Sequence, residues 1–356
     1  MKKNLMLLFI SLSFIFLLSE FFIRKLYPQS LQRYWVIHEP EYGLIVNKKN
    51  HLYKMHRFNE FQAKYKFGEF GNRITVDSDT FNKLETKPNI LILGDSFTFG
   101  WLLKDHNTFV HKLQIDNLDF NFINSSVGAW GTAHFAAFTE LYCKKIKPKK
   151  IIVFLNTDDF YRGWASKLYK SEDDILKLNK LESSPINSEL SSFDKKIPFY
   201  KILKKNSHLF MLLRNKVYDL INPPSYAPAN RSLYYPTTNI TFTKKNILDI
   251  NNFNKKIFVN LKKQANQCGA DLFIIYNGWA KISDMDKLNP NKFFLKKAEE
   301  YFNNNKITYF DNSKNMANLY KDPMKYIINI DFHPNDKGAE LIYIGVRDNI
   351  KKFILN

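Results

Sequence analysis

The sequence predicts an α/β fold whose parallel, doubly wound sheet is of the flavodoxin-like kind. Three observations lead to this prediction. Short apolar runs recur along the chain, and Ile90 to Leu93 is continuously apolar, as expected for a strand buried on both faces of a sheet. Helical patterns separate most of these runs, and alternating strands and helices favour a parallel sheet. The length of 356 residues suits one large domain, or one domain with a substantial insertion.

The composition indicates a folded chain. Apolar residues make up 45% of it, and 32 Phe with 19 Tyr can build a sizeable core. The formal net charge of +19 would attract anionic surfaces. The basic residues are scattered rather than gathered in a stripe or a recognition motif, so we expect no nucleic-acid partner. The sequence has no metal-ligand spacing and no Walker-type loop, so we expect no metal and no cofactor.

The N-terminus carries a segment long enough to span a bilayer. Residues 5–23 form a nearly continuous apolar run, with basic residues on both sides. A cleaved signal peptide needs a small-residue cleavage site, but no Ala occurs before Ala63 and no Gly before Gly43. We therefore expect residues 1–27 to form an uncleaved signal anchor in the inner or plasma membrane. The basic tip favours a cytoplasmic N-terminus and an extracytoplasmic, periplasmic domain.

Residues 28–86 are expected to form an N-terminal extension that packs on the edge of the sheet. The segment is aromatic and basic, and Gly71-Asn72-Arg73 is a turn signal to which we assign a structural role. Residues 87–356 then form the main domain. Its five predicted strands are 89–93, 120–124, 151–155, 272–276 and 307–310.

The gap between the third and fourth strands is too long for a simple crossover, so we predict an insertion at residues 162–243. It contains a Ser-rich part at 183–192, an amphipathic helix around 200–220 and a Pro-rich loop at 223–236. An insertion of this kind can roof an active site or form a remote surface excursion, and the sequence leaves both open.

The first predicted strand leads directly into Gly94-Asp95-Ser96. Gly94 permits a sharp turn, Asp95 is a favoured N-cap, and Ser96 then lies in the first turn of a helix. Chemistry in open α/β sheets is located at such strand ends. The tripeptide alone fits an ordinary turn followed by a helix cap, so a catalytic interpretation needs a partner.

That partner occurs near the C-terminus, where Asp331 and His333 precede Pro334. A serine hydroxyl becomes a nucleophile when an imidazole takes its proton, and a carboxylate orients the imidazole. Taken alone, His333 fits equally well a surface loop ahead of a capped helix. Together the two motifs predict Ser96 as nucleophile, His333 as general base and Asp331 as the residue that orients the imidazole.

With these motifs the chain resembles the SGNH or GDSL hydrolase superfamily, in particular its membrane-anchored bacterial members, over most of residues 88–352. The resemblance implies that the amide of Ser96 and a main-chain amide of block 124–132 bind the oxyanion. Gly128 is the nearest candidate in that block, and Ala129 is the alternative. The Asp-x-His spacing departs from much of the superfamily, which has Asp-x-x-His, and agrees with the anchored subgroup.

The third block of the resemblance is the least faithful. Asp158 stands where the family has its oxyanion-binding asparagine. A carboxylate cannot stabilise an oxyanion unless it is protonated, so our candidate is Asn156, and a site with backbone donors alone is the alternative.

The expected function is that of a membrane-anchored, extracytoplasmic serine esterase or O-acyltransferase that acts on O-acyl groups, such as acetyl groups, of an envelope or exported glycan. This substrate class follows from the expected location and the resemblance. Expected partners are an acylated glycan or small ester, the membrane, and a membrane acyltransferase. The alternative is a catalytically inactive SGNH-fold module for glycan binding or assembly, which Asp158 favours. Cys143 and Cys268 could pair in an oxidising compartment.

Overall fold

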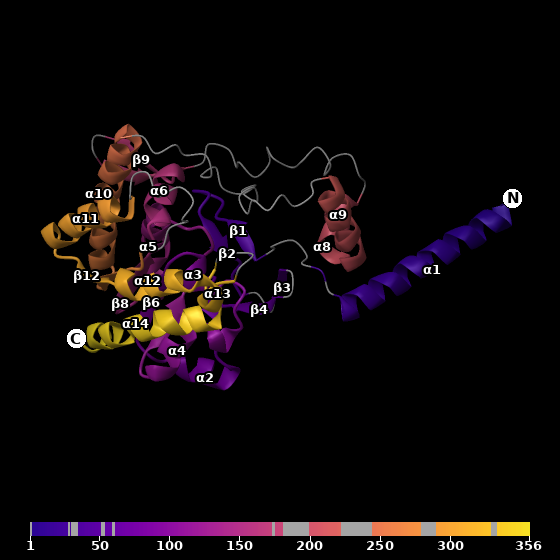
Figure 1. The fold of residues 1–356 in the computed structure, drawn as a ribbon, viewed down its shortest axis with the longest axis horizontal. Helices are drawn as coiled ribbons and strands as arrows, with labels where there is room; N and C mark the ends of the chain where they lie inside the picture. The colour runs from indigo at the N-terminus through magenta and orange to yellow at the C-terminus, as the bar shows by residue number, and fades with distance from the viewer. Residues whose placement is uncertain are drawn as a thin grey trace.

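The structure is a computed structural model that describes residues 2–27, 29, 35–50, 54–58, 61–172, 175–180, 199–221, 244–278, 290–328 and 333–356. At its centre is a five-stranded parallel sheet with the order β12-β11-β8-β6-β7 (Figure 1). Numbered along the chain, this is the order 2-1-3-4-5 of flavodoxin-like sheets. The predicted fold class is confirmed, and every predicted strand lies within one residue of its observed bounds: β6 Asn89–Leu93, β7 Asn121–Asn124, β8 Lys150–Leu155, β11 Asp271–Tyr276 and β12 Thr308–Asp311.

Helices cover both faces of this sheet because alternate strand residues point to opposite sides. Leu91 and Val153 belong to one buried cluster, with residues of α5 Thr132–Ile146, α10 Lys244–Gln267 and α11 Pro290–Asn304. Ile92 and Phe154 belong to the other cluster. The helices of that second face are α4 Phe109–Asp116, α12 Ser313–Lys321, α13 Pro323–Tyr326 and α14 Asp336–Leu355. The strands are therefore buried on both faces, as their continuous apolar pattern predicted.

Short antiparallel strands precede the main sheet. They are β1 Val36–His38, β2 Ile45–Asn47, β3 Lys54–Phe58, β4 Phe61–Phe67 and β5 Arg73–Ile74, followed by α2 Ser78–Leu84. β1 pairs with β2, and β4 pairs with both β3 and β5. Tyr65 packs edge-on against Phe99, just after Ser96, with ring centroids 4.9 Å apart. The extension therefore supports the segment that follows Ser96.

Arg73 is the main polar link between this extension and the domain. Its Nη1 donates to the carbonyl oxygens of Phe99 and Gly100 at 2.9 and 2.7 Å, and its Nη2 donates to that of Leu103 at 2.8 Å. The guanidinium also pairs with Asp105 in the short helix η1 Asp105–Asn107, at 2.8 Å. These contacts fit the structural role expected for this arginine.

The described part of the insertion contains β9 Tyr169–Glu172, β10 Ile175–Leu178, α8 Tyr200–Asn206 and α9 His208–Ile221. The helix predicted around 200–220 is thus two helices that meet at Ser207. The Ser-rich part at 183–192 and the Pro-rich loop at 223–236 lie outside the described residues. The insertion boundary predicted at residue 162 falls inside α6 Asp158–Ala165, which packs on α5 within the domain.

Helix α1 Lys2–Leu26 extends away from the α/β domain, with the N-terminus at its far end (Figure 1). Among the described residues it is the one helix that is long and apolar enough to cross a membrane, over Asn4–Leu26. Helices α8 and α9 lie beside its other end, where Ser207 Oγ donates to Glu20 at 2.8 Å. These two helices therefore fit the remote excursion rather than the roof of a site.

Cys143 of α5 and Cys268, which follows α10, form a disulfide with their Cα atoms 6.1 Å apart. This separation is ordinary for a disulfide. The pairing that the sequence left open is thus present, and it joins two helices on the same face of the sheet.

Candidate active site

Ser96 lies in the sharp turn that follows β6. A Cβ at Gly94 would collide with the side chain of Thr98, so a larger residue does not fit there. The Asp95 carboxylate caps the short helix α3 Ser96–Phe99 by accepting from the Phe97 N–H at 2.9 Å. Gly100 ends this helix with φ 79°, which favours glycine. The turn therefore leaves Ser96 partly exposed at the carboxyl end of a central strand.

The backbone from His333 to the start of α14 is held by hydrogen bonds. The Ile328 N–H donates to the His333 carbonyl oxygen at 2.8 Å, and Ile327 forms an antiparallel bridge with Pro334. Asn335 then caps α14 by accepting from the Gly338 N–H at 3.0 Å. The strand-like pairing and the capped helix fix the point from which the imidazole projects.

The imidazole of His333 meets Ser96. His333 Nε2 lies 2.7 Å from Ser96 Oγ, within the hydrogen-bond range that a nucleophile and its base require. The rings of Phe97 and Trp101 lie beside the imidazole, with centroids 5.4 and 6.1 Å away. Asp331 lies outside the described residues, so its orienting role stays a prediction.

Gly128 lies next to Ser96 on the neighbouring loop. A Cβ at Gly128 would lie 3.8 Å from Ser96 Cβ. The loop is fixed to the strand end because the Val127 N–H donates to the Gly94 carbonyl oxygen at 3.3 Å. Ala129, the alternative candidate, has a left-handed φ of 64° in the same turn. The main chain of this loop is therefore close enough to Ser96 for the amide role expected of Gly128.

Asn156 follows β8, the strand beside β6. Its side chain is fully buried, and neither its Nδ2 nor its Oδ1 has a hydrogen-bond partner among the described residues. Burying such an amide without a partner is costly, so a substrate or intermediate that supplies an acceptor would offset the cost. Asp158 instead accepts from Arg162 Nη2 at 3.2 Å. Of the two residues, Asn156 is the one whose side chain has an N–H group that can donate to an oxyanion.

Sequence reasoning missed Arg162, which pairs with three carboxylates, among them that of Asp95, the residue before Ser96. It lies 3.2 Å from Asp95, 3.2 Å from Asp158 and 3.5 Å from Asp159. Burial, with the nearby Asp95 carboxylate, raises the pKa of Asp159 well above its ordinary value. Burial opposes the charge of Arg162, but the carboxylates, led by Asp158, outweigh it and raise the pKa of the guanidinium.

The signal for part of this cluster was present in the sequence. Arg162 stands four residues after Asp158, a spacing that favours an ion pair on one helix face. The pair with Asp95, which is 67 residues away in the chain, has no such signature.

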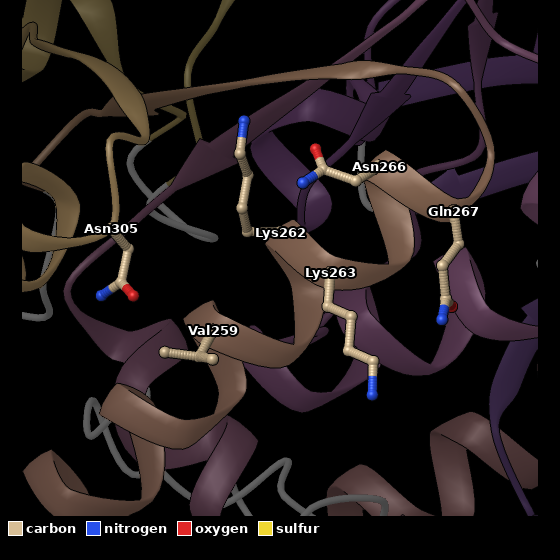
Figure 2. A pocket seen from close by; sticks show the side chains of 6 residues that line it. All are labelled: Val259, Lys262, Lys263, Asn266, Gln267 and Asn305. Carbon is tan, nitrogen blue, oxygen red and sulfur yellow. The ribbon is translucent and has the colours of Figure 1, made fainter.

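A hollow of about 440 Å³ on α10 lies elsewhere, lined by Val259, Lys262, Lys263, Asn266, Gln267 and Asn305 (Figure 2). Helix α10 leads into the amino end of β11, and Asn305 precedes the amino end of β12. Ser96 follows the carboxyl end of β6, and these strands are parallel. The hollow therefore lies at the edge of the sheet where the strands begin, and the Ser96–His333 pair lies at the edge where they end. We assign the hollow no part in that site.

No family model matches the chain, and no curated protein matches it. Several solved structures are similar to it. One is an esterase from Pseudoalteromonas sp., 14% identical over 76% of this chain and 100% of that one, with a TM-score of 0.45. Another is a lipolytic protein of the G-D-S-L family from Veillonella parvula, 12% identical over 73% and 96%, with a TM-score of 0.41. A variant of an acetyl-xylooligosaccharide esterase from Geobacillus is 11% identical over 73% and 93%, with a TM-score of 0.40.

The flavodoxin-like sheet and the loop ahead of α14 bring Ser96 and His333 together at the carboxyl end of a buried strand. The α/β fold that the resemblance implies is present, with a parallel sheet in the flavodoxin-like order and a Gly-Asp-Ser turn at the carboxyl end of its first strand. Identities this low say nothing of individual residues, and we base their roles on the geometry of this chain.

Proposed function

We propose that this chain is a membrane-anchored, extracytoplasmic serine esterase or O-acyltransferase that acts on O-acyl groups, such as acetyl groups, of an envelope or exported glycan. One observation carries the proposal: His333 Nε2 lies 2.7 Å from Ser96 Oγ. A serine hydroxyl that an imidazole can deprotonate, at the carboxyl end of a buried strand, is suited to attack an acyl carbonyl.

In the proposed mechanism Ser96 Oγ attacks the acyl carbon while His333 takes the hydroxyl proton. The amides of Ser96 and Gly128, with Asn156 Nδ2, donate to the oxyanion of the tetrahedral intermediate. When the intermediate collapses, His333 returns the proton to the leaving alcohol and an acyl-serine remains. Water or a sugar hydroxyl then attacks the acyl-serine, again with His333 as base, and frees Ser96. Asp331 would orient His333 throughout.

Three features support the proposed location. Helix α1 is long and apolar enough to anchor the chain, and the two lysines at its start favour a cytoplasmic tip. The disulfide between Cys143 and Cys268 supports an oxidising, extracytoplasmic compartment, because such bonds are rare in reducing cytosol. The catalytic domain would then face the envelope glycans from the membrane surface.

Replacement of Ser96 tests the enzyme directly. We expect Ser96→Ala to abolish turnover of p-nitrophenyl acetate while the circular dichroism spectrum and unfolding midpoint stay unchanged. Ser78→Ala is the matched control, since Ser78 is an exposed serine at the start of α2. Turnover that persists in folded Ser96→Ala would eliminate the mechanism.

The second candidate function is a non-catalytic SGNH-fold module that binds glycan or helps assemble an envelope complex. The observation that favours it is Asp158, a carboxylate paired with Arg162 where the family has an oxyanion donor. A fluorophosphonate probe separates the two, because it labels an activated serine. Labelling of Ser96 supports the enzyme, whereas folded, unlabelled protein that retains polysaccharide binding supports the module.

Hydrolase and transferase share the acyl-serine intermediate and differ in the group that attacks it. Incubation with an acetyl donor and candidate glycans, while acetate release and sugar acetylation are both followed, distinguishes them. Glycan acetylation in excess of acetate release would assign a transferase. A membrane acyltransferase is the partner protein that we expect in that case.

A further inference from the structure

The start of α8 and the middle of α9 each expose a pair of large apolar side chains. Leu213 and Val217 are one helical turn apart on α9 and are 56% and 54% exposed. Phe199 and Ile202, at the start of α8, are 73% and 56% exposed. Apolar residues at this spacing usually form the buried face of an amphipathic helix. Exposed apolar residues of this kind therefore mark a surface that a lipid membrane or another molecule covers.

The amino end of α9 is docked on the candidate membrane helix α1. Glu20 of α1 accepts hydrogen bonds from the backbone N–H groups of His208 and Leu209, at 3.0 and 2.8 Å, and from Ser207 Oγ at 2.8 Å. A carboxylate at this position caps the helix and complements its dipole. Arg24 adds a bond from Nη2 to the Asn206 carbonyl oxygen, at 2.6 Å. The contact is therefore specific and polar.

This docking point lies at the end of α1 that leads into the rest of the chain. Glu20 and Arg24 are within the last turns of the apolar segment, which ends at Leu26. That is the depth at which polar side chains of a spanning helix reach the headgroup region. In Figure 1, α8 and α9 stand beside the carboxyl end of α1, at an angle to its axis. A helix that starts at the interfacial end of a spanning helix and leaves it at an angle is positioned to lie along the membrane surface.

Two further features fit a lipid surface. Exposed apolar residues also occur on α1 at the docking point, where Phe21 and Phe22, which follow Glu20 in the chain, are 56% and 50% exposed. Lys216 is exposed beside Val217, and a basic residue beside apolar ones suits anionic headgroups above acyl chains.

We propose that α8 and α9 form an interfacial hairpin that lies on the membrane crossed by α1, with Phe199, Ile202, Leu213 and Val217 inserted between lipid headgroups and acyl chains. The inference rests on the anchoring role proposed above for α1. The occupant of the exposed face is the phospholipid surface. Because α9 is fixed both to the anchor and to that surface, the hairpin would set how the rest of the chain is held against the membrane.

The test uses the full chain in nanodiscs of phosphatidylethanolamine and phosphatidylglycerol, with a nitroxide label attached to a single introduced cysteine. Labelling without reductant keeps Cys143 and Cys268 paired. Leu213→Cys carries the label on α9. Ile344→Cys is the matched control, because Ile344 is 51% exposed on α14 of the α/β domain. Accessibility to oxygen, which partitions into lipid, is compared with accessibility to a water-soluble nickel chelate.

We expect a ratio of oxygen to nickel accessibility several-fold higher at Leu213 than at Ile344, and we expect Glu20→Ala to reduce it. A label at Leu12→Cys on α1 reports the anchor independently. Equal ratios at Leu213 and Ile344, with a lipid-exposed Leu12 label, would overturn the hairpin and leave the anchor standing. A water-exposed Leu12 label would overturn both. A Leu213 label shielded from both reagents would assign the face to a protein partner or a second copy, and also overturns the lipid proposal.

Discussion

The Arg162 guanidinium lies 3.2 Å from a carboxylate oxygen of Asp95, so helix α6 is tied to the residue that precedes Ser96. The other oxygen of Asp95 accepts from the Phe97 N–H and thereby caps the turn that presents Ser96. Asp95 and Asp159 are almost fully buried, and Arg162 is the cation that both of them contact. The geometry of the Ser96 turn therefore depends on this buried ion cluster.

Removal of Arg162 should destabilise the protein strongly. Arg162→Met would leave buried carboxylates without their cation, and breaking a buried ion pair in this way typically costs about 3 to 5 kcal/mol. Urea unfolding of detergent-solubilised protein measures the loss. The control is Arg347→Met, because Arg347 pairs with the well-exposed Asp348 and should change the free energy of unfolding by less than about 0.5 kcal/mol. Equal losses in the two variants would contradict the role given to the cluster.

Asn156 should act as a side-chain oxyanion donor. Its amide is buried and unpartnered among the described residues, and losing one such donor typically lowers kcat about a hundredfold or more. We expect Asn156→Ala to show this loss on p-nitrophenyl acetate with little change in KM. Gly128→Ala is the control for the main-chain donor, since the added Cβ fits at 3.8 Å from Ser96 Cβ and the amide is retained. A folded Asn156→Ala variant with unchanged kcat would leave the site with backbone donors alone.

The sheet and the Ser96–His333 pair could be predicted from the sequence because their signals are local. The strands are apolar runs buried on both faces, and Gly94 and Pro334 mark the turns beside the two polar residues. Ser96 follows the carboxyl end of a parallel strand, whereas His333 lies between α13 and α14, so its pairing with a serine 237 residues away was predicted from the chemistry of the two residue types.

The Arg162 cluster could not be predicted because it depends on how closely two helices pack. A Cβ at Gly131 would lie 2.5 Å from the Gly163 nitrogen, so only glycine allows α6 to approach the start of α5. In this packing arrangement Arg162, a residue of α6, contacts the Asp95 carboxylate. The break between α8 and α9 could not be predicted for a similar reason. Glu20, which accepts the hydrogen bonds at this break, lies 187 residues before Ser207 in the chain.

Buried His134 should make stability depend on pH. Burial lowers its pKa from 6.5 to about 3, while its Nδ1 accepts from the Gly131 N–H at 3.1 Å. Below pH 6.5 the unfolded chain binds a proton at His134 that the folded chain does not bind. The contribution of His134 to the free energy of unfolding is therefore full above pH 6.5 and is lost as the pH falls towards 3. Between pH 7 and pH 5 the loss is about 2 kcal/mol.

His134→Gln isolates this contribution, because glutamine can still accept from the helix start but does not titrate. Urea unfolding at pH 7 and pH 5 should show a pH-dependent loss smaller by about 2 kcal/mol in the variant than in the original protein. His106→Gln, at an exposed site, should leave the loss unchanged. A His134→Gln variant with the same pH dependence as the original protein would show that His134 is not the group responsible.

Asp331 should be the carboxylate that orients His333. The sequence places it two residues before the histidine, and residues two apart in an extended segment project to the same side. Asp336 is the nearest rival in sequence, but it lies exposed in the first turn of α14. In serine hydrolases, loss of the orienting carboxylate leaves the imidazole in the wrong tautomer and can lower kcat about ten-thousandfold.

The pair Asp331→Asn and Asp336→Asn therefore distinguishes the two carboxylates. We expect Asp331→Asn to lower kcat for p-nitrophenyl acetate by at least about a hundredfold, with KM and folding little changed, because the hydroxyl would lose an oriented base. Asp336→Asn should retain nearly full activity. The opposite result would move the orienting role to Asp336 and leave Ser96 and His333 in place. Full activity in both variants would mean that His333 works without either carboxylate, and fluorophosphonate labelling of Ser96 in the double variant would then show whether the serine is still activated.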